Sequence, residues 1–188
     1  MKYDIILCGV GGQGVLSVAA AIATAAASEG LQVRQSEVHG MAQRGGAVMS
    51  HLRLSDETIP GDLVPRGAGD LILSMEPLEA LRYTGYLKPD GALVTADEPF
   101  ENIPSYPAIE GIAQKIRSFA GAQMISAASI AKEAGNRRAV NMAMVGAASN
   151  VLPLPQESLE KAIETMFERK GEAVVKANIA AFRGGRGK

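Results

Sequence analysis

The sequence has 188 residues, 47% of them hydrophobic and 21% charged, and this balance excludes an intrinsically disordered chain. The sequence has 19 Lys and Arg residues and 20 Asp and Glu residues, so its formal charge is −1. The chain therefore has no overall positive charge that would bind nucleic acid or an anionic membrane. Cys8 is the only cysteine, which excludes an intrachain disulfide, a cysteine-based zinc site and an iron–sulfur cluster, and suits the reducing cytoplasm where we expect the protein. This length predicts a single domain over residues 1–188.

The beginning of the chain predicts a strand, a helix and a second strand. Residues 3–8 form a short apolar run with β-branched side chains, and residues 31–38 read as the second strand. Between them, the alanine-rich residues 15–28 have strong helix propensity, and Gly30 is a typical C-terminal cap. Two strands joined through a helix make a βαβ unit, which crosses right-handed and predicts a parallel sheet. The uncharged run 5–28 is not expected to span a membrane, because glycines and weakly hydrophobic alanines fill it.

Strands then alternate with helices, and helices dominate the C-terminal third. Further strands are expected at 47–54, 70–75, 92–96 and 123–126. Helices are expected from Pro77 and over 109–119, 129–134, 139–150, 156–169 and 171–183. Residues 56–69 read as an excursion, 88–91 as a turn and 183–188 as a frayed tail. The pattern predicts an α/β doubly wound, Rossmann-like fold with a mostly parallel sheet flanked by helices.

A glycine-rich loop lies between the first predicted strand and helix. Its G-x-G-x-x-G pattern supplies the candidate ligand-binding residues Gly9, Gly11, Gly12, Gln13 and Gly14. Glycines allow a tight turn and close backbone approach, and free N–H groups at a helix N-terminus attract an anion such as phosphate. Close packing of strand and helix would also require such glycines. The loop carries no base or nucleophile, so it indicates binding rather than chemistry.

A dinucleotide-binding fold would place an acidic residue near the end of the second strand, and Glu37 stands there, although a polar strand end explains it equally well. The loop that follows reads His-Gly-Met-Ala-Gln-Arg-Gly-Gly. In it, Arg44, followed by Gly45 and Gly46, could present a guanidinium fork to a phosphate or carboxylate. His39 could carry a proton near neutral pH. Simple hydrogen bonding of the histidine and pairing of the arginine with a nearby acid are the ordinary alternatives.

GVGGQGV at 9–15 together with SEVHGMAQRGGAVMSHLRL at 36–54 resembles the gamma-type domain family of 2-oxoacid:ferredoxin oxidoreductases. The His-Gly-Met-Ala-Gln-Arg-Gly-Gly form is most similar to the beta subunit of the indolepyruvate, or arylpyruvate-using, branch. The resemblance extends over nearly the full length, including NMAMVGAASNVLPLP at 141–155.

The resemblance implies a non-cluster subunit that works with a larger subunit holding thiamine diphosphate and [4Fe-4S] clusters. The complex would decarboxylate an arylpyruvate oxidatively to an aryl-acetyl-CoA and carbon dioxide, with ferredoxin as electron acceptor. This chain lacks the Gly-Asp-Gly segment expected of a thiamine diphosphate site, so neither a catalytic residue nor a metal ligand is expected in it. The resemblance also implies a platform for coenzyme A (CoA). We therefore predict that the 9–14 loop and Arg44 lie together at the carboxyl ends of adjacent strands, holding CoA phosphates or shaping the mouth of the partner's active site.

Two other functions stay open at this point: a free-standing NAD(P)- or FAD-binding Rossmann protein, and a pure assembly module without a ligand. Arg137 and Arg138 precede a helix, where positive charge opposes the macrodipole, which hints at a paired acid or a partner contact. The small-residue helix at 141–149 could pack on the sheet or on another subunit.

The remaining candidate side chains have ordinary explanations. His51, inside a strand, is expected to bond a backbone carbonyl, and Cys8 to be a small buried apolar residue. Asp97, Glu98 and Glu101 follow a strand at the ligand-binding edge, although a solvated loop explains them as well.

Overall fold

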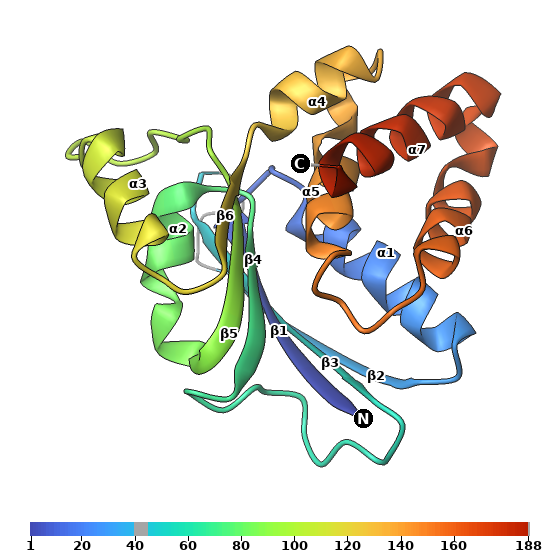
Figure 1. The fold of residues 1–188 in the computed structure, drawn as a ribbon, viewed down its shortest axis with the longest axis horizontal. Helices are drawn as coiled ribbons and strands as arrows, with labels where there is room; N and C mark the ends of the chain where they lie inside the picture. Colours follow the sequence, from blue (N-terminus) through green and yellow to red (C-terminus); the bar gives the residue numbers. More distant parts are fainter. Residues whose placement is uncertain (40–44, 188) are drawn as a thin grey trace.

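The computed structural model describes residues 1–39 and 45–187, with the side chain of His39 excepted. One six-stranded sheet has the strand order β2-β3-β1-β4-β5-β6 (Figure 1). The strands are β1 Lys2–Val10, β2 Gln32–His39, β3 Ala47–Ser55, β4 Gly69–Ser74, β5 Leu87–Ala96 and β6 Ala122–Ile125. Neighbours β1, β4, β5 and β6 pair in parallel, whereas β3 pairs antiparallel with both β1 and β2. The mostly parallel sheet predicted from the sequence is therefore confirmed.

Helices cover both faces of this sheet (Figure 1). On one face lie α2 Pro77–Arg82 and α3 Ile109–Arg117; on the other lie α1 Val15–Ser28, α4 Ala127–Glu133, α5 Val140–Ala148, α6 Gln156–Phe167 and α7 Glu172–Arg186. Three short 3₁₀ turns complete the elements of the described residues: η1 Thr84–Tyr86, η2 Arg137–Ala139 and η3 Glu168–Lys170. The doubly wound α/β architecture follows the prediction, with the C-terminal helices all on the α1 face.

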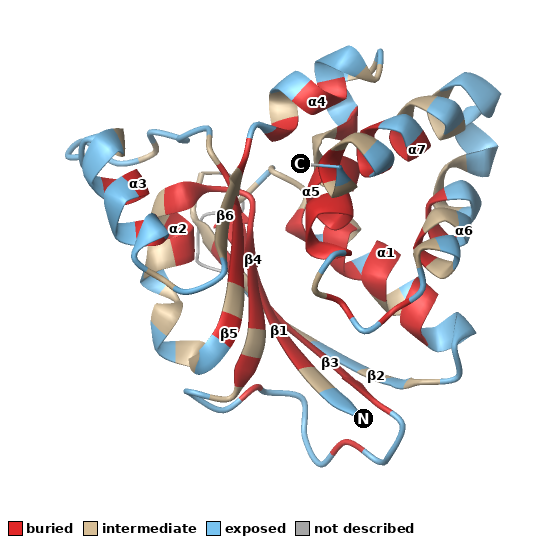
Figure 2. Ribbon diagram, in the orientation of Figure 1, coloured by how far each residue is buried: buried red, intermediate tan, exposed pale blue. Residues whose placement is uncertain are grey.

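The two faces of β1 belong to two separate cores, because successive side chains of a strand point in opposite directions. Ile5 and Leu7 join the larger core with α1 and α5, whereas Ile6 and Cys8 join the smaller core under α2 and α3. Figure 2 shows the buried residues concentrated along the central strands and on the helix faces that meet them. Strand β1 is therefore the rigid centre that positions the glycine loop at its carboxyl end.

The predicted adjacency of the first two strands is wrong, because β3 lies between them. Strand β3 pairs with β1 from Lys2↔Ser55 to Val10↔Ala47 and with β2 from Gln32↔Ser55 to His39↔Val48. A parallel pair needs a crossover of about a dozen residues or more, whereas a short connection joins antiparallel neighbours. Only residues 40–46 separate β2 from β3, so the chain turns straight back along β2.

The turn expected at 88–91 is instead the first part of β5. The β4–β5 pairing jumps from Gly69↔Leu87 to Leu71↔Ala92, so β5 accommodates extra residues as a bulge. A Cβ on Gly91 would lie 2.9 Å from the carbonyl oxygen of Gly69, which shows how closely the two strands approach there. Lys88 Nζ forms an ion pair with Asp70 Oδ1 on β4 at 2.5 Å. This ion pair helps to hold the polar residues 88–91 on the sheet, although their sequence is typical of a turn.

The frayed tail predicted from Arg183 onward is also wrong, since α7 continues to Arg186. Its glycines allow α5 and α7 to touch at backbone distance: a Cβ on Gly185 would lie 1.9 Å from the carbonyl oxygen of Ala143. Arg186 donates through Nη1 to the Ser149 hydroxyl at 2.8 Å, and its carbonyl accepts from the Asn150 side chain. The small-residue helix at 141–149 therefore packs mainly on the C-terminal helix of its own chain.

Candidate functional site

A cleft of about 490 Å³ lies where the carboxyl ends of β1, β4 and β5 meet. Strand β1 leads into α1 on one face of the sheet, and β4 leads into α2 on the opposite face. Such a reversal opens a crevice at the sheet edge, where α/β proteins bind ligands. We call it the switch-point cleft; it is lined by Gly12, Gln13, Gly14, Met75, Ala96, Glu98, Pro99, Phe100, Arg137, Arg138, Val140 and Asn141.

The glycine loop forms the floor of this cleft and needs glycine at two positions. Gly12 has φ +103° and Gly14, the N-cap of α1, has φ +81°, a region of backbone conformation that strains other residues. No backbone carbonyl of the described residues accepts from the amides of Gly12 or Gly14. These N–H groups lie at the positive end of the 14-residue helix α1, so the floor suits an anion.

Gln13 and Gly9 build the loop itself. The Gln13 side chain accepts from the Val10 amide at 2.8 Å and donates to the Met75 carbonyl at 3.2 Å, which ties β1 to the end of β4. A Cβ on Gly9 would lie 2.9 Å from Gln13 Oε1 and 3.0 Å from Met75 Cβ, so this glycine makes room for the bridge. Both residues therefore set the shape of the floor.

The opposite wall comes from the start of α5, more than a hundred residues along the chain. Arg137 and Arg138 occupy the 3₁₀ turn η2, which is capped by Asn136 Oδ1 accepting from the Arg138 amide at 3.0 Å. Asn141 donates through Nδ2 to the Gly14 carbonyl at 3.2 Å and so fixes this wall against the glycine loop. Two exposed guanidinium groups thus flank the N-terminus of α1 in one cleft.

Glu98 is the acidic side chain lining the same cleft. Burial and the neighbouring Asp97 raise the pKa of Glu98 above its ordinary value. Both effects disfavour the charged form of the Glu98 carboxyl. Asp97 itself accepts a hydrogen bond from the Ser126 hydroxyl. The balance of guanidinium groups, helix terminus and amides makes the cleft suited to phosphate groups.

The second loop predicted from the sequence meets the glycine loop at its described end. The Gly11 amide donates to the Gly46 carbonyl at 2.8 Å, and the Gly45 amide donates to the Gly11 carbonyl at 3.2 Å. Glu37 lines a smaller cleft of about 240 Å³ with Gly11, Gly12 and Leu16 on the other side of the loop. Arg44 and the side chain of His39 lie outside the described residues, and their predicted roles stay predictions.

Sequence reasoning did not assign Arg137 and Arg138 to the ligand site. The available signal was the pair of positive charges at a helix start, where they oppose the macrodipole. An anion bound between them and the α1 N-terminus would remove that conflict. Glu101, grouped with Glu98 in the prediction, lines a separate cavity of about 260 Å³ rather than the switch-point cleft.

Cys8 and His51 are both structural. Burial raises the pKa of Cys8 to about 12, so the thiol stays protonated in the smaller core, as predicted. His51 accepts at Nδ1 from the Val64 amide at 3.2 Å, so the carbonyl partner predicted for it is wrong. Burial and the nearby Arg53 lower the pKa of His51, which favours the neutral ring and leaves a nitrogen able to accept.

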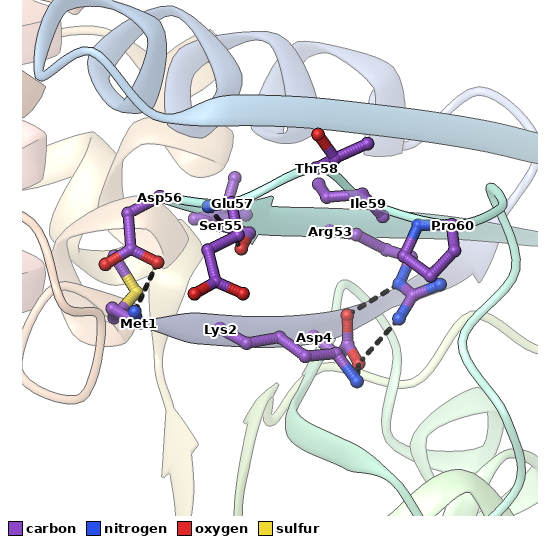
Figure 3. A pocket seen from close by; sticks show the side chains of 11 residues that line it. Met1, Lys2, Asp4, Arg53, Ser55, Asp56, Glu57, Thr58, Ile59 and Pro60 are labelled. Atoms are coloured by element: carbon purple, nitrogen blue, oxygen red, sulfur yellow. Dashed lines mark hydrogen bonds and ion pairs between the residues drawn. The ribbon is translucent and has the colours of Figure 1, made fainter.

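A cavity of about 410 Å³ lies at the opposite end of β1, and the charged residues that line it have a structural role (Figure 3). Buried Arg53 binds Asp4 through Nε at 2.8 Å and donates through Nη1 to the carbonyls of Gly61 and Leu63. Lys2 also reaches Asp4 at 3.0 Å. The charges of Arg53 and Asp4 are therefore paired, and Arg53 holds the segment that follows β3 to the sheet.

Residues 4–187 match the family described as pyruvate ferredoxin/flavodoxin oxidoreductase. The chain belongs to this family. It is 36% identical over 194 residues to the indolepyruvate oxidoreductase subunit IorB of Methanothermobacter thermautotrophicus, covering 100% of this chain and 97% of that subunit. The Thermococcus kodakarensis subunit of the same name is 35% identical, with 96% and 93% covered.

Solved structures of the family share the fold. The 2-oxoglutarate:ferredoxin oxidoreductase of Magnetococcus marinus, solved with 2-oxoglutarate, coenzyme A and succinyl-CoA bound, has a TM-score of 0.79 and 26% identity, covering 99% of this chain. The present chain spans only 30% of that longer chain. Pyruvate oxidoreductase subunit PORC of Thermotoga maritima has a TM-score of 0.74 and 25% identity, with 100% and 96% covered.

The described residues contain neither a membrane-spanning helix nor a metal-binding group of side chains. No helix in residues 1–39 and 45–187 is long and apolar enough to cross a membrane. In the same ranges, no three His, Cys, Asp or Glu side chains are grouped to hold a metal ion.

Proposed function

We propose that this chain is the non-cluster subunit of a cytoplasmic indolepyruvate ferredoxin oxidoreductase, and that residues 1–188 form a single gamma-type domain. The observation that carries the proposal is the contrast in identity between branches. Four subunits named for indolepyruvate are 34–36% identical over at least 96% of the chain. Subunits named for ketoisovalerate and 2-oxoglutarate are 27–29% identical over a similar share.

A partner subunit must supply the redox centres. The only cysteine of the sequence is buried in the core, so this chain has no ligand set for an iron–sulfur cluster. In the complex, thiamine diphosphate supplies the decarboxylation chemistry and [4Fe-4S] clusters carry electrons to ferredoxin, both from the larger subunit. This chain then contributes binding and shape to the shared site.

The residues of the switch-point cleft fit the phosphate groups of CoA. Gly12 and Gly14 of the floor and Arg137 and Arg138 of the wall beside it line the same cleft, with their amides and guanidinium groups as donors. Each is a donor group, and together they recognise charge without supplying a nucleophile or base. Holding the nucleotide end here leaves the thiol arm free to reach the partner's reaction centre.

The order of the strands argues against the dinucleotide alternative. A Rossmann dinucleotide site places its ribose-binding acid on the strand beside the first one. Here β3 separates β1 from β2, so Glu37 lies two strands from β1, a displacement of about 10 Å, and it lines the smaller cleft rather than the switch-point cleft. Titration of the lone chain with NADH remains the direct check, and micromolar binding would favour that alternative.

Reconstitution tests the subunit assignment. We expect the chain to co-purify with a larger thiamine-dependent subunit and the complex to reduce ferredoxin when indolepyruvate and CoA are supplied. Either subunit alone is expected to be inactive. A complex that turns over pyruvate or 2-oxoglutarate faster than indolepyruvate would contradict the substrate assignment.

The assignment of CoA is tested by substitution of the cleft arginines. In the complex, Arg137→Ala combined with Arg138→Ala is expected to raise the KM for CoA by about tenfold or more, as removal of charge-assisted hydrogen bonds predicts. Arg117→Ala, an exposed arginine at the end of α3, is the matched control. An unchanged KM with intact assembly would favour a pure assembly module. Arg44→Ala tests the second loop in the same assay.

A further inference from the structure

The segment between β5 and α3, residues 97–108, forms one wall of the switch-point cleft. It contains no helix or strand, and three prolines interrupt it. Glu98, Pro99 and Phe100 of this wall segment line the cleft. A stretch without backbone ladders must be held by its side-chain contacts, so the groups that fix it also determine the shape of the cleft.

One buried carboxylate holds the wall segment at two points. Glu76, only 1% exposed, follows β4 and caps α2, its Oε2 accepting from the Glu79 amide at 2.7 Å. Its Oε1 accepts from the Phe100 amide at 3.3 Å and from the Tyr106 hydroxyl. A carboxylate satisfied by three donors is strongly held, and so are the donors.

The wall segment is also joined to the glycine loop through Gly45, and the glycine loop is joined to the residue that precedes Glu76. Asn102 donates through Nδ2 to the Gly45 carbonyl at 2.8 Å, and the Gly45 amide bonds Gly11. Met75, the residue before Glu76, accepts from the Gln13 side chain. The floor and this wall of the cleft are thus held together by hydrogen bonds through Gly45 and by the chain segment Met75–Glu76.

Phe100 lines the cleft, and its backbone is fixed by the hydrogen bond from its amide to Glu76. Phe100 is 44% exposed, so it keeps apolar surface available to a ligand in the cleft. Across the same cleft lie Val140 and the cationic turn η2. An apolar ring opposite guanidinium groups suits a ligand that has both phosphate and apolar portions.

We propose that Glu76 is a positioning residue for CoA: through the Phe100 amide and the Tyr106 hydroxyl it holds the Phe100 ring against the apolar portion of the bound molecule. This proposal rests on the function proposed above and adds a second recognition element to it. The arginines and amides bind the phosphates, and Phe100 supplies contact area that a free phosphate could not use.

The test is the Kd for CoA of the assembled complex, measured by calorimetry without a 2-oxoacid. We expect Phe100→Ala and Glu76→Gln to weaken CoA binding by about tenfold and Tyr106→Phe by about threefold, in line with the loss of one contact or charge-assisted bond. Phe100→Tyr should restore binding because it keeps the ring. The KM for indolepyruvate is expected to stay unchanged in all of them.

Glu101→Gln is the matched control, because this exposed carboxylate is on the same segment but lines the separate cavity. If Glu76→Gln fails to fold, Tyr106→Phe and Phe100→Ala decide the matter, since neither removes the buried charge. Unchanged CoA binding in these two variants, while the arginine double variant weakens it, would overturn the role of Glu76 and leave the proposed function intact. Unchanged binding in the arginine variant as well would remove the CoA site itself.

Discussion

At the residue scale, the glycine loop combines two different requirements for glycine. Gly12 is exposed, and a Cβ there would meet no atom within 4 Å, so only its φ of +103° demands glycine. Gly14 has both a positive φ and a close neighbour, because a Cβ would lie 2.2 Å from Asn141 Nδ2. The first glycine keeps the floor of the cleft open, and the second permits the arginine wall to approach.

We therefore expect Gly14→Ala to destabilise the protein more than Gly12→Ala. The Gly12 variant should cost about 1–2 kcal/mol of unfolding free energy for its backbone conformation alone. The Gly14 variant adds displacement of Asn141 and should also weaken CoA binding by the complex. Urea unfolding of both variants checks the order, and equal losses would show that Asn141 moves aside freely.

The sequence was enough to identify the glycine loop and the second loop, because both are contiguous motifs beside strong element signals. The predicted meeting of Arg44 with the 9–14 loop stays a prediction, because Arg44 lies outside the described residues. It could not place Arg137 and Arg138 opposite Gly14, since that pairing depends on how α5 packs. Glu76 carried no motif at all. Its three donors come from segments whose approach only the folded chain determines.

At the element scale, the pairing of α5 with α7 positions the arginine wall. A Cβ on Gly146 would lie 1.9 Å from the Phe182 carbonyl oxygen, and one on Gly185 would lie equally close to that of Ala143. The helices therefore touch through their backbones over two matching glycines. Any side chain at this contact must push α5 away from α7 and so shift η2, which lies at the start of α5.

Gly185→Ala is expected to lower the free energy of unfolding by about 1–3 kcal/mol, as overpacking in a close core contact does. It should also weaken CoA binding by the complex through the shift of η2. Gly187→Ala is the control, because its Cβ would approach no atom closer than 3.6 Å. Equal stability of the two variants in thermal unfolding would contradict the close contact.

A pH dependence is expected where α6 meets α7. Hydrogen bonds from Arg183, at 2.9 and 2.6 Å, lower the pKa of Glu160 below its ordinary value of 4.5. A carboxyl with a depressed folded pKa contributes stability above its unfolded pKa and loses it as the pH falls through the folded value. The contribution should therefore be present at pH 7 and be lost progressively as the pH falls below about 4.5.

Glu160→Gln should accordingly lower the unfolding free energy at pH 7 by on the order of 0.5 kcal/mol, the usual size for an exposed ion pair. Its difference from the natural protein should shrink as the pH falls from 4.5. Glu157→Gln, exposed on the same helix, is the comparison variant. A difference that is constant from pH 7 to pH 3 would contradict the role of this pair.

At the scale of the whole molecule, the parallel strands bring the recognition elements to one edge of the sheet. Alternation of strands and helices was sufficient to predict the fold class and most element bounds. The same alternation did not predict the strand order, because the insertion of β3 between β1 and β2 leaves no signal in the sequence of β1 or β2. The bulged start of β5 and the helical C-terminus also depend on distant partners, Asp70 and Ser149.

The most direct measurement is a structure of the assembled complex with CoA bound. We expect CoA phosphates within hydrogen-bond distance of the Gly12 or Gly14 amide and of an Arg137 or Arg138 guanidinium group, with the Phe100 ring against the apolar portion. CoA phosphates held entirely by the partner subunit, with the switch-point cleft filled by solvent or partner side chains, would contradict the account.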